Sequence, residues 1–192
     1  MPWTPRTSAP DVTIKYYRHT GYYVGVTEGV NECLLIDNIT GFVMPNCVGY
    51  TWGRWYEALH TRPNCSQGDG WTWWGYNDGY ARGNTPRVGA IACWKDNTTP
   101  GHNGHVAVVE YFDSNGRPVT SNSAYGGPLF FMETLTYDSL NDSWLRAYNP
   151  SQYGWQGFIY PPGGIDLKKF LLFMGQRRFP NGRGYIPNNR RF

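Results

Sequence analysis

The chain has 192 residues, of which 17% are aromatic, and its 24 glycines and 14 prolines favour one domain of strands and loops over a helical bundle. Residues 1–162 contain 10 Lys and Arg against 13 Asp and Glu, a net charge of −3, whereas residues 163–192 contain 7 against one, a net charge of +6. No run approaches the roughly 18 apolar residues of a membrane-spanning helix, and the first residues lack the charged and apolar regions of a signal peptide. We therefore expect no membrane span and, for any action outside a cell, release by another route.

The N-terminal residues form the first predicted part, an arm or extension over residues 1–30. Residues 1–12 are rich in Pro, Ser and Thr, which favours an extended arm. Residues 13–26 are aromatic and partly alternating, which is compatible with a pair of short strands that turns at Thr20 and Gly21. We infer no function for this part from its sequence.

A helix is predicted to begin at Cys47. Pro45 disfavours helical angles at the residue before it, Asn46 is a good N-cap, and the helix should end before Pro63. The apolar residues that recur at helical spacing are Val48, Trp52, Trp55, Tyr56 and Leu59. This face should pack inward, with Cys47 one position away at the margin of the core.

Cys47 is a candidate nucleophile because the N–H groups and dipole of a first helical turn stabilise an anion and lower a thiol's pKa. A small buried residue is the alternative, since free cysteines often have that role. The spacings of Cys33, Cys65 and Cys93 fit neither a zinc site nor a dense disulfide framework, so we expect no metal and no cofactor. Cys65, in a polar loop, is expected to be the next most exposed thiol.

Residues 64–87 are predicted to be rich in loops, and their aromatic side chains crowd among glycines. These are Trp71, Trp73, Trp74, Tyr76 and Tyr80. They can line a sugar-binding groove or simply pack in the core and loops.

The second half of the chain is predicted to form an antiparallel sheet. Strands are expected over residues 88–94, 105–112, 118–125, 129–136 and 155–160. The sequence Asp-Ser-Asn-Gly at residues 113–116 is a strong hairpin signal between the second and third of these strands. Residues 161–164 close the domain, which we place at residues 31–162.

His105 is the best-placed candidate for a base, because it begins a central strand whose neighbours can fix its ring. A surface or structural histidine is the alternative. Alternation places Glu110 on the opposite face of the strand. With either tight turn, Asn122 pairs with Ala107 or Val109 and so shares a face with His105, which makes it the candidate for orienting the ring.

Four linked motifs resemble those of the CHAP domain, the cysteine, histidine-dependent amidohydrolase/peptidase family. They are the segments 45–54, 86–91, 104–110 and 121–126, and residues 156–160 resemble the closing strand of phage-encoded members. The resemblance covers roughly residues 31–162 and implies a papain-like α+β fold, with a Cys-bearing helix packed on a twisted antiparallel sheet. It also implies cleavage of peptidoglycan amide bonds with Cys47 as nucleophile and His105 as base.

The chain departs from the family pattern at two places. Many members carry Glu where this chain has Asn122, and an amide would stabilise a protonated imidazole less than a carboxylate. Some members bind calcium through acidic residues just before the cysteine, whereas residues 36–45 contain Asp37 as their one acid, so we expect no calcium dependence from that loop. The candidate substrate-binding residues are Trp73, Trp74 and Tyr125.

The sequence therefore favours a hydrolase of bacterial cell-wall peptidoglycan, either an N-acetylmuramoyl-L-alanine amidase or an endopeptidase, since both cut an amide. A phage lysin is expected, carried in the virion or released from the host cytoplasm to act at the wall. The basic, aromatic tail over residues 163–192 suits docking on an anionic wall polymer or a phage tail protein, although a disordered tail has a similar composition; no nucleic-acid partner is expected. The alternatives are a virion structural or wall-docking protein with little activity, and a bacterial amidase delivered as a toxin.

Overall fold

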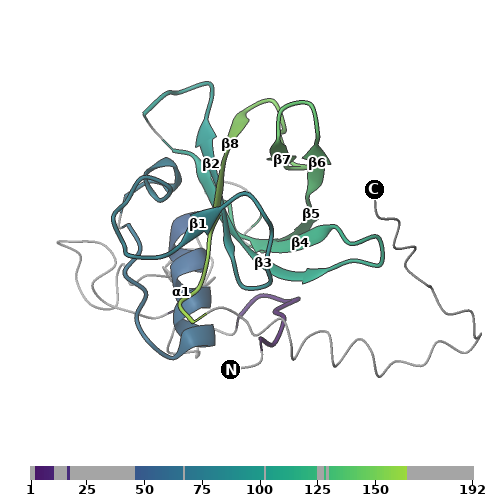
Figure 1. Cartoon of the computed structure of the whole chain (residues 1–192). Coiled ribbons are helices and arrows are strands. Elements are labelled where there is room, and N and C mark those ends of the chain that lie inside the picture. Colours follow the sequence, from purple (N-terminus) through teal and green to yellow (C-terminus); the bar gives the residue numbers. More distant parts are fainter. Residues whose placement is uncertain are drawn as a thin grey trace, which may run out of the picture.

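The structure is a computed structural model that describes residues 3–10, 17, 46–66, 68–101, 103–124, 128 and 130–163 (Figure 1). The predicted strand pair in residues 13–26, the acid-poor loop at residues 36–45 and the basic tail lie almost wholly outside these residues. Within the described part of the chain, no helix has the length and apolar character needed to cross a membrane. The expected division at residues 1–30, 31–162 and 163–192 stays a prediction.

The helix α1 (Cys47–Leu59) begins and ends as the local sequence predicts. The Asn46 side chain accepts a hydrogen bond from the Gly49 N–H at 2.8 Å, which satisfies one of the free donors of the first turn. At the other end His60 takes left-handed angles, and its N–H donates to the Tyr56 carbonyl. The helix therefore presents Cys47 at its first position.

In the described part of the chain, six antiparallel strands form the main sheet in the order β1-β8-β2-β3-β4-β5 (Figure 1). Their bounds are β1 (Arg82–Gly83), β2 (Ile91–Asp96), β3 (His105–Phe112), β4 (Pro118–Asn122), β5 (Phe131–Thr134) and β8 (Tyr153–Ile159). A separate hairpin consists of β6 (Thr136–Asp138) and β7 (Ser143–Leu145), and a 3-10 turn, η1 (Gly70–Thr72), precedes β1. The packing of helix α1 on an antiparallel sheet confirms the predicted α+β class.

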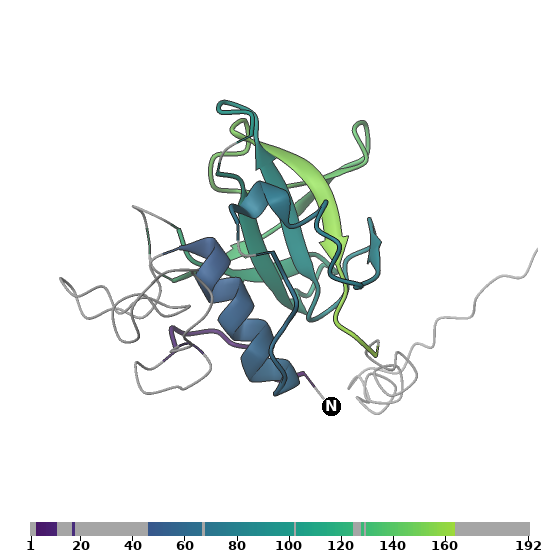
Figure 2. The same cartoon turned by 90° about the vertical axis from the view of Figure 1, so that its left-hand side faces the viewer.

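The two faces of the sheet bury different cores. Alternation along β2 and β3 sends Cys93 and Val106 towards α1, which lies against one face of the sheet (Figure 2). Trp94 belongs to the opposite core, which includes Leu135 between β5 and β6 and is flanked by Trp144 of β7. The expected single strand over residues 129–136 is therefore divided at Leu135, whose N–H donates to the Pro118 carbonyl at 2.9 Å.

The β3–β4 hairpin reaches the predicted face assignment through a different register. Its turn has three residues, since the N–H of Asp113 donates to the Arg117 carbonyl at 2.9 Å, so both expected two-residue turns are wrong. An extra residue, Glu110, bulges from β3 between the pairs Val109–Thr120 and Tyr111–Val119. The three-residue turn shifts the strand pairing by one residue, and the bulge shifts it back by one residue. Asn122 therefore still lies on the same face of the sheet as the first residue of β3.

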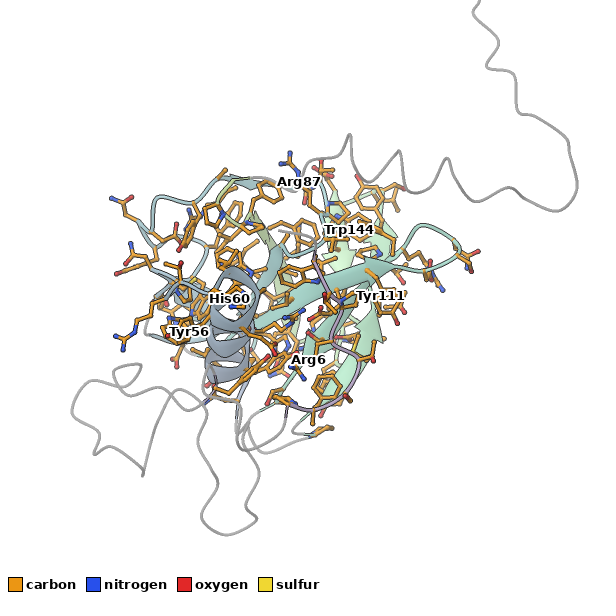
Figure 3. The ribbon with its side chains drawn as sticks, turned by 90° about the horizontal axis from the view of Figure 1, so that it is seen from below. Arg6, Tyr56, His60, Arg87, Tyr111 and Trp144 are labelled. Atoms are coloured by element: carbon orange, nitrogen blue, oxygen red, sulfur yellow. The ribbon has the colours of Figure 1, made fainter. Side chains whose placement is uncertain are left out.

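The described N-terminal segment packs on this scaffold through a buried charge network. Glu110 is fully buried and accepts hydrogen bonds from Arg54 of α1 at 2.8 and 2.9 Å. It also accepts hydrogen bonds from the Trp3 indole N–H at 2.9 Å and from the Arg6 backbone N–H at 3.0 Å. Arg6 pairs in turn with Glu57, and Figure 3 shows its side chain beside α1. Residues 3–6 thus contact the C-terminal half of α1, away from Cys47.

Candidate active site

His105 occupies the first position of β3 and is 3% exposed. It pairs across the sheet with Trp94, and the rings of Trp94 and Tyr153 each lie 5.9 Å from its own. Its Nε2 lies 2.9 Å from Oδ1 of Asn122, which is also fully buried. Two strands and two aromatic rings therefore hold the imidazole in one orientation.

The surroundings of Asn122 determine which ring nitrogen of His105 carries the proton. The Asn122 Nδ2 donates to both the carbonyl and the hydroxyl of Thr120 at 3.0 Å, so the amide oxygen must be the atom that faces His105. An amide oxygen only accepts, so Nε2 of the histidine donates to it. In the neutral imidazole this leaves Nδ1 with a free lone pair, as a base requires.

Cys47 lies beside the start of β3. Its side chain is largely buried, and a backbone hydrogen bond from Val106, the residue after His105, favours the thiolate. Cys47, the first residue of α1, therefore lies against the residue that follows His105, and His105 itself contacts Asn122, the last residue of β4.

Burial raises the pKa of the Cys47 thiol above its ordinary value. The backbone of Val106, the charge of Arg146 and the first-turn N–H groups all lower it, but burial is the larger effect. The expectation of a lowered thiol pKa is thus wrong in its net direction, because the position at the start of a helix does not reveal how deeply the thiol is buried. Without a base the thiol stays protonated near neutral pH.

The pKa of His105 lies well below its ordinary value, first because of burial and then because of the Arg146 charge, while the Asn122 hydrogen bond opposes both. The imidazole is therefore neutral near pH 7. A protonated thiol and a neutral imidazole are the protonation states that general-base activation of the sulfur requires. Arg146 was missed by the sequence interpretation, and no local pattern marks it, since it follows β7 in a polar segment.

The predicted substrate-binding residues have different positions. Trp73 is fully buried in the core under α1 and its indole donates to the Gly68 carbonyl at 3.3 Å, so it offers no surface to a substrate and that prediction needs correction. Trp74 is half-buried over Gly157, where its ring leaves no room for a side chain. Tyr125 lies outside the described residues.

Trp71 is the partly exposed indole next to the site, at 36% exposure. The backbone N–H of Trp71 donates to the Asn103 carbonyl at 3.0 Å, and its backbone carbonyl accepts from the Gln156 side chain at 3.2 Å. The preceding Gly70 lies against the His105 backbone so closely that a Cβ there would stand 2.9 Å from the His105 nitrogen. This contact, which places Trp71 near the start of β3, depends on the turn η1 and has no signature in the sequence.

Cys65 and Cys93 are both buried, and burial raises the pKa of each thiol. Among the described cysteines, Cys65 at 5% exposure comes next after Cys47 at 8%, as expected, although its side chain is buried. Among the described residues, no group of three or more His, Cys, Asp or Glu side chains has an arrangement that would hold a metal ion. The expectation about calcium concerns residues 36–45, which lie outside that description.

A cysteine at the start of a helix, beside a histidine at the start of a strand in an antiparallel sheet, defines the papain-like class of α+β domains. More particularly, residues 37–124 match the family model of the CHAP domain, which confirms the resemblance carried by the motifs. The chain is also similar to the solved structure of an N-acetylmuramoyl-L-alanine amidase from Staphylococcus aureus, with 27% sequence identity and a TM-score of 0.40. That match covers 50% of this chain and 28% of the amidase chain.

Proposed function

We propose that the protein is a peptidoglycan hydrolase that cleaves an amide bond of the cell-wall peptide, with Cys47 as nucleophile, His105 as base and Asn122 as the residue that orients the base. The observation that carries the proposal is the 2.9 Å contact between His105 Nε2 and Asn122 Oδ1. It fixes the ring with Nδ1 unprotonated at the end of the sheet where Cys47 begins α1. The CHAP match over residues 37–124 supports the substrate class.

In the proposed reaction, His105 Nδ1 takes the thiol proton as Cys47 Sγ attacks the amide carbonyl. The tetrahedral oxyanion is stabilised by the Cys47 backbone N–H, one of the first-turn donors that have no partner within a helix. His105 then protonates the leaving amine, which departs and leaves an acyl-enzyme. A water molecule activated by the same nitrogen releases the acid and restores the thiol. Amidase and endopeptidase cleavage both follow this course.

Zymography against several bacterial cell walls tests the proposal. The wild-type protein should clear the embedded wall, whereas Cys47→Ala and His105→Ala should bind it without clearing. If the wild type binds without clearing, the alternative of a wall-docking protein with little activity is correct. If Cys47→Ala clears normally, Cys47 is not the nucleophile.

We also propose a bacteriophage origin and action at the bacterial wall, supported by the resemblance of residues 156–160 to the closing strand of phage-encoded members. The basic tail over residues 163–192 would dock on an anionic wall polymer or a phage tail protein, as its charge suggests. Its deletion should weaken binding to whole cells more than hydrolysis of soluble wall fragments. Equal losses in both assays would place the tail within the catalytic fold.

A further inference from the structure

Arg146 is a buried cation directly after β7, and only 3% of it is exposed. Its Nε donates to Glu133 Oε2 of β5 at 3.1 Å. The other oxygen of Glu133 accepts the Tyr148 N–H at 2.6 Å. Both partners of the ion pair are thus held by the scaffold, and the guanidinium has a fixed place.

The aromatic rings that hold His105 also hold Arg146. The guanidinium carbon lies 4.7 Å from the ring centre of Tyr153 and 5.6 Å from that of Trp94. The same two rings lie 5.9 Å from the His105 ring. Arg146 and His105 therefore flank a shared pair of aromatic side chains on the face of the sheet opposite to α1.

The charge of Arg146 is incompletely compensated. Its Nη2 is buried and, in the part of the chain that the structure describes, has no hydrogen-bond partner. Leaving such a donor unpaired costs free energy, so the buried Nη2 without a partner calls for an explanation. Its field acts on both members of the site, since it lowers the pKa of Cys47 and that of His105.

We propose that Arg146 is a positioning residue of the Cys47–His105 site, where its fixed positive charge keeps the imidazole unprotonated and stabilises negative charge on the sulfur. This inference rests on the proposed function and deepens it. Asn122 favours the protonated imidazole through a hydrogen bond but adds no charge, so burial and Arg146 outweigh it in the pKa of His105. The cation thus favours the resting state that can accept the thiol proton.

The other titratable groups near the pair do not supply this charge. Cys93 on β2 and Tyr153 on β8 have raised pKa values and are neutral near pH 7. Asp96 on β2 is an anion that is bonded to Thr98 and Gln152. Glu133 on β5 is the anion paired with Arg146, and it reduces the field of Arg146 without cancelling it.

Two titrations test the proposal without relying on wall hydrolysis. The pKa of His105 is measured by NMR, and the pKa of Cys47 by the pH dependence of its alkylation with iodoacetamide, resolved by mass spectrometry. In Arg146→Met both pKa values should rise by about one unit, as expected for loss of a nearby unit charge in a partly buried site. In the matched control Arg146→Lys, which keeps the charge, both should stay near the wild-type values.

Glu133→Gln provides a test in the opposite direction, which applies even if Arg146→Met fails to fold. It removes the anion and leaves the cation less compensated, so both pKa values should fall, and a rise of either would overturn the inference. Unchanged pKa values in folded Arg146→Met would also overturn it. If the wild type cleaves no wall while these shifts occur, the proposed function fails and the charge effect stands; if it cleaves walls without the shifts, only the inference about Arg146 fails.

Discussion

Glu110 and Asn122 are both buried in the β3–β4 hairpin, and substitutions at the two positions should separate stability from activity. Glu110 faces α1 and ties it to β3 and to the N-terminal segment, whereas Asn122 faces His105 on the other side of the sheet. Glu110→Gln should therefore destabilise the fold and leave the rate of hydrolysis unchanged. Asn122→Ala should do less to the fold and much more to the rate.

The expected cost of Glu110→Gln follows from its contacts. Breaking a buried ion pair by removing one partner costs about 3–5 kcal/mol. Arg54 keeps Glu57 at 3.0 Å and the Thr4 carbonyl at 2.6 Å, and glutamine retains one acceptor oxygen, so we expect about 3 kcal/mol. For a chain of this size, about 2–4 °C per kcal/mol gives a decrease in Tm of about 6–12 °C.

Asn122→Ala removes the acceptor for His105 Nε2 and the donor to two oxygens of Thr120. The stability cost should be about 1–3 kcal/mol, as for buried polar groups left unpaired. The rate should fall because the ring is free to rotate, although by less than the roughly 10²–10⁴-fold of a lost general base in His105→Ala. Asn122→Glu should retain more activity than Asn122→Ala and move the acidic limb of the pH profile upward, since a carboxylate stabilises the imidazolium and the base acts as the neutral imidazole.

The assay combines calorimetric Tm values with hydrolysis rates measured well below the Tm of every variant. The reasoning would be refuted if Glu110→Gln were folded but inactive while Asn122→Ala hydrolysed the wall at the normal rate. That result would mean that Asn122 does not face His105 and that the bulge at Glu110 is wrongly placed.

Three further predictions concern the site and the nearby Trp71. Cys47→Ala should abolish wall hydrolysis and change the Tm by only a few degrees, because the substitution removes a single buried sulfur atom; lysis retained by the variant would exclude Cys47 as the nucleophile. Stability should decrease as the pH falls below about 6.5, by at most about 1.4 kcal/mol per pH unit, because the pKa of His105 is lowered in the fold and the unfolded chain binds the extra proton. Chemical denaturation of His105→Gln should show a smaller slope over this range, and an equal slope would contradict the buried neutral imidazole. Trp71→Ala should raise the KM for wall fragments with little change in Tm. Substitution of the buried Trp73 in Trp73→Ala should instead cost about 3–5 kcal/mol of stability. The reverse pattern would exclude Trp71 from substrate binding.

Local features of the sequence predicted the elements well where local interactions determine them. The start of α1 follows from Pro45 and Asn46, whose effects act within one turn of the chain. The face of Asn122 was predicted correctly because it depends only on whether the register shifts by an odd or an even number of residues. The turn and the bulge at Glu110 both differ from the expected register, but together they leave the face unchanged.

Features that depend on tertiary packing were not predictable in the same way. The net pKa shift of Cys47 depends on how deeply β3 buries it, and the place of Arg146 depends on how the chain after β7 packs against Trp94. Among the crowded tryptophans, the contacts of η1 decide that Trp71 is at the surface and Trp73 in the core. Because both positions hold tryptophan, the residue type does not indicate which of the two is buried.

Mass spectrometry of purified peptidoglycan digested in H₂¹⁸O tests the central claim most directly. Hydrolysis of an amide by the wild-type protein should yield fragments with one new free amine and one ¹⁸O atom in the newly formed carboxyl group, and Cys47→Ala should yield none. The position of the new carboxyl would also separate an amidase from an endopeptidase. New reducing sugar ends without new amines, or the same fragments from Cys47→Ala, would contradict cysteine-dependent amide cleavage.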